Sequence, residues 1–183
     1  MASLKLKHIL LSLLVVLVTG CAVLPKTLNE SNLIVVANYK WIGKIGKTTL
    51  SEGAALPILK NITTGRKYSP KYKNKSFTYF YNLSEGNYIV DEIVLNAGRV
   101  QLHMKLKDKA NPFKIDQSGV YYIGGIDIVD YQTRFEYRLH DGNQVQNDVE
   151  IVRNLLSAKT SFQQSSKIIV IENVLNRERW ETK

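Results

Sequence analysis

The sequence has little of what covalent cross-linking and catalysis usually need. Its 183 residues contain a single cysteine, Cys21, so a disulfide within the chain is excluded and packing must supply the stability. Three histidines occur, and none forms a His-x-x-x-His or Cys-containing metal motif. No Gly-x-Ser-x-Gly sequence is present, which argues against a serine hydrolase of that type. We therefore expect neither a metal nor a cofactor.

One short motif resembles a phosphate-binding loop but fails a simple check. Gly46-Lys47-Thr48 would need a glycine five residues before Gly46, and Trp41 occupies that position. The segment is interpreted as a hairpin turn.

The amino-terminal stretch MASLKLKHILLSLLVVLVTGCAVLPK is the most informative part of the chain. Lys5 and Lys7 form a positive start, and no acidic residue precedes Glu30. Residues 9–18 then form a ten-residue apolar run that is interrupted only by Ser12. This length fits a secretory signal peptide and falls short of the roughly 20 residues that span a bilayer.

Residues 18–21, Val-Thr-Gly-Cys, resemble the lipobox of bacterial lipoproteins. The resemblance implies that residues 1–20 are removed, that Cys21 receives a diacylglyceryl group, and that the new amino terminus is also acylated. Two or three acyl chains, at about 0.8 kcal/mol per buried CH2, hold a protein stably at a membrane. Because Ala22 follows the cysteine instead of an aspartate, the resemblance implies the outer membrane, facing the periplasm or the cell surface.

Two other interpretations of the amino terminus remain open. Cys21 could stand by chance beside an ordinary cleavage site, or the apolar run could stay uncleaved as a signal anchor. If the lipobox is used, loss of Lys5 and Lys7 lowers the formal charge from +9 to +7. Residues 21–32 are then expected to be a lipidated tether, and residues 33–183 a single domain.

The domain is predicted to be mainly β, an antiparallel β-sandwich with one amphipathic carboxy-terminal helix. Residues 100–107 alternate between apolar and polar side chains, as a strand with one wet face does. Gly124-Gly125 interrupts an apolar strand and predicts a bulge or a close approach. The helix is expected at about residues 148–159, with Asp148 as its cap. Strands are expected at 33–42, 55–62, 76–83, 87–96, 99–107, 113–115, 119–129, 135–140 and 167–174.

Three short segments add a second resemblance. Residues 83–90, LSEGNYIV, resemble the L-x-x-G-x-Y-x-apolar turn of transthyretin-like and carboxypeptidase-regulatory-like sandwiches. Residues 62–66 are similar to a hairpin of the same modules, and residues 120–124 to a segment found in lipoproteins of this kind. Such modules have no catalytic residues of their own, so the resemblance implies a structural or binding role.

A basic stretch is the candidate binding site. Residues 66–75 carry five positive charges interleaved with two tyrosines. Anionic glycan or lipid headgroups are the expected ligands, with another envelope protein as an alternative partner; nucleic acid is not expected in the envelope. A solvated segment that only prevents edge-to-edge pairing is the other interpretation. The candidate residues are Arg66, Lys67, Tyr68, Lys71, Tyr72, Lys73 and Lys75.

An enzyme would have to assemble its site from residues distant in sequence. Asp91 and Glu92 are adjacent on a predicted strand, so their side chains are expected on opposite faces. Asp127 is the acid whose burial matters most, because a deep pocket holding it with His103 or His140 would favour an envelope hydrolase. We expect a non-enzymatic protein.

The lipobox leads to a direct test. A Cys21→Ala chain should lose metabolic palmitate labelling and keep its signal peptide, because both lipid transfer and cleavage depend on the thiol. Labelling and mass spectrometry of the membrane fraction measure this, with the unchanged chain as control. Persistent labelling of the variant would refute the assignment.

Overall fold

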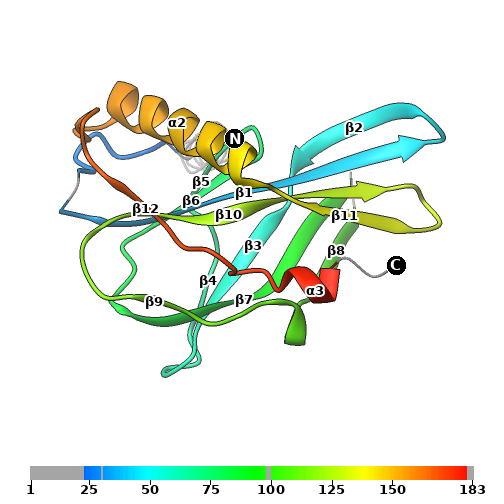
Figure 1. Cartoon of the computed structure of the whole chain (residues 1–183), viewed down its shortest axis with the longest axis horizontal. Helices are drawn as coiled ribbons and strands as arrows, with labels where there is room; N and C mark the ends of the chain where they lie inside the picture. Colours follow the sequence, from blue (N-terminus) through cyan, green and yellow to red (C-terminus); the bar gives the residue numbers. More distant parts are fainter. Residues whose placement is uncertain (1–22, 30, 98–99, 181–183) are drawn as a thin grey trace, which may run out of the picture.

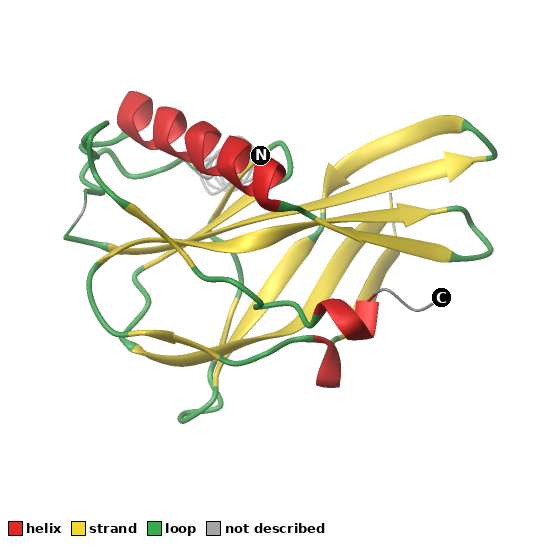
Figure 2. Cartoon of the chain, in the orientation of Figure 1, coloured by secondary structure: helices red, strands yellow, loops and turns green. Residues whose placement is uncertain are grey.

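Two β-sheets face each other in the computed structural model, and helix α2 (Gly142–Lys159) covers the outer face of one of them (Figure 1). The structure describes residues 23–29, 31–97 and 100–180, so Cys21 and the predicted signal peptide lie outside the described residues. Strands dominate the described chain (Figure 2), which confirms the prediction of a mainly β sandwich. No helix among the described residues is long and apolar enough to cross a bilayer.

The first sheet, here called sheet A, has the order β11-β10-β1-β6-β5, with β2 paired to β1 and β12 paired to β10. Its central pair, β1 and β10, is parallel, and so is the β10–β12 pair. The sequence-based prediction of an antiparallel sandwich did not anticipate this parallel centre. The strands are β1 (Leu33–Ile45), β2 (Thr48–Ala54), β5 (Tyr72–Asn74), β6 (Phe77–Tyr81), β10 (Gly119–Asp130), β11 (Phe135–Leu139) and β12 (Ile168–Val170).

The second sheet, sheet B, is antiparallel and has the order β4-β3-β7-β8, with β9 paired to β7. The predicted hairpin of β7 and β8 is confirmed, as is the turn interpretation of Gly46, which has a φ of 57° between β1 and β2. The strands of sheet B are β3 (Leu56–Asn61), β4 (Lys67–Tyr68), β7 (Gly86–Ala97), β8 (Val100–Lys105) and β9 (Phe113–Ile115). The two short helices outside the sheets are the 3-10 helix η1 (Lys107–Lys109) and helix α3 (Arg177–Trp180).

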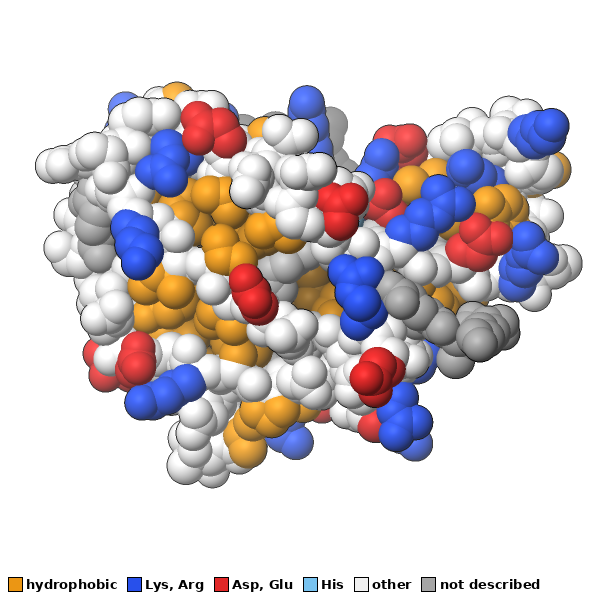
Figure 3. All heavy atoms as spheres, viewed as in Figure 1, with side chains coloured by type: hydrophobic (Ala, Val, Ile, Leu, Met, Phe, Trp, Pro, Cys, Tyr) orange, Lys and Arg blue, Asp and Glu red, His pale blue; other side chains and the backbone are white. Residues whose placement is uncertain are grey.

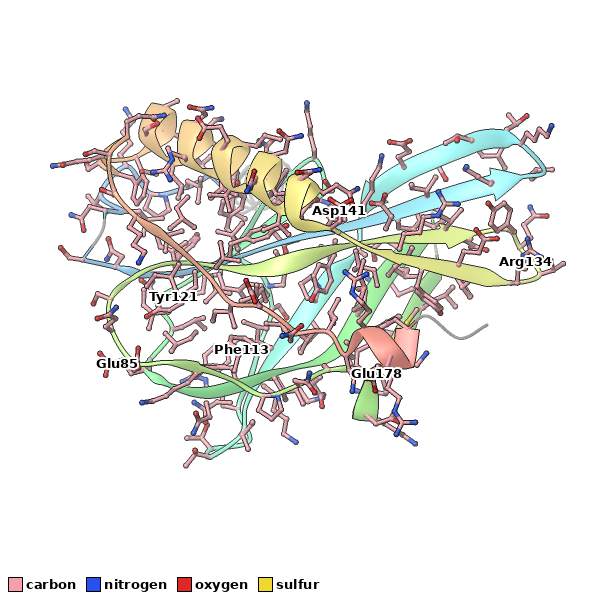
Figure 4. The ribbon with its side chains drawn as sticks, viewed as in Figure 1. Glu85, Phe113, Tyr121, Arg134, Asp141 and Glu178 are labelled. Carbon is pink, nitrogen blue, oxygen red and sulfur yellow. The ribbon has the colours of Figure 1, made fainter. Side chains whose placement is uncertain are left out.

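The main core lies between the two sheets. Tyr121 of sheet A and Phe113 of sheet B both belong to it, and Figure 4 shows them in the space between the sheets. Tyr88, which opens β7 after the predicted glycine turn, is fully buried there, and its hydroxyl donates to the Ser84 carbonyl at 2.7 Å. At about 25 cal/mol per Å2 of apolar area removed from water, this interior is the main source of stability.

A second core lies between the outer face of sheet A and α2. Leu24 and Leu28, expected in a tether, are buried in it with exposed fractions of 1% and 3%. The Lys26 carbonyl accepts hydrogen bonds from the Ser161 amide and hydroxyl, which fixes this segment to the chain just after α2. The described part of residues 21–32 therefore packs on the domain instead of acting as a spacer. The core consists of Leu24, Leu28, Ile34, Val36, Phe77, Tyr79, Val120, Tyr122, Val152, Leu156, Phe162 and Ile168.

Helix α2 begins six residues before the predicted start. Asp141 caps it, because its side chain accepts from the Gln144 amide at 2.9 Å while the Gln144 side chain accepts from the Asp141 amide at 3.0 Å. This reciprocal capping box satisfies amide groups that the first turn leaves free. The first turn is polar and exposed, so the apolar periodicity used to predict the helix does not reach it. Asp148 is consequently an interior helix residue and not a cap.

Candidate functional site

The predicted basic stretch does not form one loop. Its first half lies in β4 at the edge of sheet B, and its second half lies around β5 at the edge of sheet A. Lys67 forms an ion pair with Asp91, with Nζ 2.6 Å from Oδ2, and this contact lowers the pKa of Asp91. The Arg66 guanidinium lies 5.1 Å from the centre of the Tyr68 ring. These groups of the first half are thus engaged within the protein.

The two tyrosines of the stretch face inward. Tyr68 packs edge-on against Tyr88 at 5.9 Å, and Tyr72 packs against Tyr79 at 5.4 Å. Lys71 lies over the ring of Tyr81 at 5.1 Å. The two remaining cations, Lys73 and Lys75, are exposed, and neither forms an ion pair with another described residue. The half on sheet A therefore presents two exposed lysines that have neither an ion pair nor a ring contact with the described residues.

The expectation that Asp91 and Glu92 point apart is wrong. Glu92 pairs with Ile58 of β3 and Val90 pairs with Leu59, so Asp91 is the extra residue of a β-bulge. The bulge turns both carboxylates toward Lys105, which contacts Glu92 and lies 3.8 Å from Asp91. His103, exposed as predicted, adds a contact of 3.3 Å to Glu92. Surrounding cations neutralise this acidic pair.

A buried polar network under α2 is the more specific feature. The Asp148 carboxylate accepts a hydrogen bond from Asn38 Nδ2 at 2.8 Å, one from the Tyr122 hydroxyl, and one from His140 Nδ1 at 2.7 Å. These donors come from β1, from β10 and from the turn before α2. Asp148 is 6% exposed and the His140 side chain 8%. The network therefore ties the helix to sheet A within an otherwise apolar layer.

A bulge in β10 makes room for His140. Val36 pairs with Tyr122 and Asn38 with Gly125, so two residues of β10 stand opposite one residue of β1. Gly124, at a φ of 90°, is one of these two. A Cβ atom at Gly125 would collide with the His140 ring, and the His140 amide donates to the Gly125 carbonyl at 3.0 Å. Both predictions for this glycine pair, bulge and close approach, are confirmed.

Asp127, the acid singled out in the sequence, is half-buried beside the same histidine. His140 Nε2 lies 3.4 Å from Asp127 Oδ1, so a carboxylate engages each ring nitrogen. Burial by itself lowers the pKa of His140, but the hydrogen bonds and charges of Asp127 and Asp148 raise it to about 9. The hydrogen bond from His140 in turn lowers the pKa of Asp127. At neutral pH the ring is therefore an imidazolium between two carboxylates.

This arrangement limits the chemistry that the histidine can perform. A general base must offer a free nitrogen near neutral pH, whereas both nitrogens of His140 donate to carboxylates. The two carboxylates lie at opposite edges of the ring, and no cluster able to hold a metal ion occurs among the described residues. The network is suited to holding charge in place.

A pocket of about 250 Å3 lies next to His140. It is bounded by β10, by the start of α2 (labelled Asp141 in Figure 4) and by the chain that follows β12. Its lining combines Ile123 and Val170 with Glu172 and Arg177, but includes neither Asp127 nor Asp148. Figure 3 shows apolar side chains at the surface near β12, below α2 in the view. The pocket thus borders the network without exposing its carboxylates.

Asp127 and His140 could be named as candidates from the sequence, whereas Asn38, Tyr122 and the role of Asp148 could not. The one available signal was a polar residue, Asn38, within the apolar run of β1.

Compared with protein-family models, curated proteins and solved structures, the chain matches none, so its function must be argued from its own residues.

The raised pKa of His140 predicts a pH-dependent stability. Its ordinary value is 6.5 and its folded value about 9, so the stabilisation is fully present below pH 6.5 and is lost as the pH rises through 9. We expect the unfolding free energy to fall by roughly 2 kcal/mol over this range after allowance for solvent screening. Urea unfolding at a series of pH values measures this, and His140→Gln should remove the slope. An equal slope in both proteins would contradict the assignment.

Proposed function

We propose that the chain is a lipid-anchored protein of the bacterial outer membrane whose β-sandwich is a non-enzymatic binding or structural module. The lipobox supports the anchor, and the absence of an aspartate after Cys21 supports the outer membrane. The resemblance to transthyretin-like and carboxypeptidase-regulatory-like modules supports a module without catalytic residues of its own.

One structural observation carries the proposal. The ionisable groups of the network pair with one another, because Asp148 and Asp127 engage both nitrogens of His140. Buried charges in an enzyme are usually poised to act on a substrate, whereas these join α2 to sheet A. The partner remains a lipid headgroup, a cell-wall glycan or another envelope protein.

An envelope hydrolase is the second candidate. The specific observation in its favour is that Asp127 and His140, distant in sequence, lie 3.4 Å apart beside a pocket. Against it, the pKa of about 9 keeps His140 protonated, and its ring contacts no hydroxyl or thiol among its hydrogen-bond partners in the described residues.

A panel of chromogenic ester, amide, glycoside and phosphate substrates separates the two candidates. The proposal predicts no turnover above background, and the same result for Asp127→Asn as for Asp116→Asn, an exposed acid that does not line the pocket. Asp127 is only half-buried, so its variant should stay folded, which circular dichroism checks. Hydrolysis by the parent chain that Asp127→Asn loses and Asp116→Asn keeps would overturn the proposal.

A further inference from the structure

We propose that the sandwich lies directly against the membrane that holds its lipid, with the β5 edge and the amino-terminal segment facing anionic headgroups. The inference rests on the proposed lipidation of Cys21 and adds an orientation and a ligand class to it. Three independent features of the described chain support it: a short reach, an exposed apolar side chain and unpaired cations.

The reach of the anchor is short because the domain begins almost at the lipid. Leu24 is 1% exposed within the second core, so the chain is fixed to the domain from this residue onward. Only two residues lie between Cys21 and Leu24, and the three steps along the chain from Cys21 to Leu24 extend at most about 10 Å. An acyl chain at Cys21 would therefore hold the adjoining surface at the headgroups, where a long spacer would let the domain stand away.

The surface beside Leu24 suits such a position. Val23 is 65% exposed. Moving such an aliphatic side chain from water into the membrane interface beside an acyl anchor is favourable, because its apolar surface leaves water. Tyr72 of β5 and Tyr81 of β6 pack against the core that contains Leu24 and Leu28. The β5 edge therefore borders the same core as the amino-terminal segment. In Figure 1 the described chain likewise begins behind α2, near the labels of β5 and β6.

The charge of this edge complements anionic lipid. Lys73 and Lys75 flank or belong to β5, Lys26 lies two residues from Leu24, and none of the three forms an ion pair with a described residue. Residues 66–84 contain no acidic side chain. The Debye length of about 8 Å at physiological salt is comparable with the reach of the anchor, so salt screens the attraction between these lysines and the headgroups only in part. Each lysine near an anionic leaflet raises the equilibrium constant for contact with the membrane about fivefold.

The other cationic regions differ in ways that make them suitable controls. Lys67 lies at the edge of sheet B and forms an ion pair with Asp91, so its charge is already used within the protein. Lys44 and Lys47 are also without ion pairs among described residues, but they belong to the β1–β2 hairpin, which projects to the right in Figure 1, away from α2. Figure 3 shows basic and acidic side chains mixed at that end of the molecule.

Site-specific fluorescence quenching tests the orientation in the full lipidated chain. The lipid occupies the only natural cysteine, so an introduced one is the only free thiol for a fluorophore. Ser76→Cys places the label between β5 and β6, and Thr48→Cys places it at the β1–β2 hairpin. In vesicles of phosphatidylcholine and phosphatidylglycerol with a headgroup nitroxide, we expect severalfold stronger quenching at position 76. Equal quenching, or stronger quenching at position 48, would overturn the proposal.

Charge variants in the labelled Ser76→Cys chain test the ligand class. Lys73→Gln with Lys75→Gln should weaken contact about 25-fold and so reduce quenching, whereas Lys44→Gln with Lys47→Gln should leave it unchanged. Quenching that survives the first pair, or that is the same in vesicles of phosphatidylcholine alone, would contradict recognition of anionic lipid. If the parent chain itself carries no palmitate and does not float with vesicles, the lipid anchor is refuted instead, so the two failures are distinct.

Discussion

The carboxylate of Asp148 is the group on which the arrangement of this protein most depends. It accepts hydrogen bonds from Asn38, Tyr122 and His140, which belong to three different parts of the chain. A buried charge is tolerated only when its partners are in place, and removal of one partner typically costs about 3–5 kcal/mol. The network therefore fixes where α2 lies on sheet A, which apolar packing alone would define less sharply.

The position of α2 has consequences beyond the helix. Together with the outer face of sheet A it encloses the second core, and that core holds Leu24 and Leu28. Burial of these two residues leaves only a few residues between the domain and the proposed lipid on Cys21. The same polar network that engages both nitrogens of His140 thus contributes to how the proposed anchor presents the β5 edge.

Several features could be predicted from the sequence because they depend on local patterns. Apolar runs and alternating side chains predicted most of the strands, although not β2, β4 or β5, and Gly124-Gly125 predicted the bulge that admits His140. The rest depends on contacts between distant residues. Asn38 and Asp148 meet only because β1 pairs with β10 under α2, and Asp148 looked like a helix cap because the true first turn is polar. The basic stretch divides between two sheets, and the bulge at Asp91 reverses an expected side-chain direction; neither can be deduced from spacing.

A double-mutant cycle on Asp148 and His140 tests the central claim most directly. The unfolding free energies of Asp148→Asn, His140→Gln, the double variant and the parent chain give their interaction energy at pH 7. If the two groups stabilise the protein as a buried pair, the sum of the two single losses of unfolding free energy should exceed the loss in the double variant by about 2 kcal/mol. The reason is that the second substitution removes a group that already lacks its partner. Losses that add within about 0.5 kcal/mol would contradict the account.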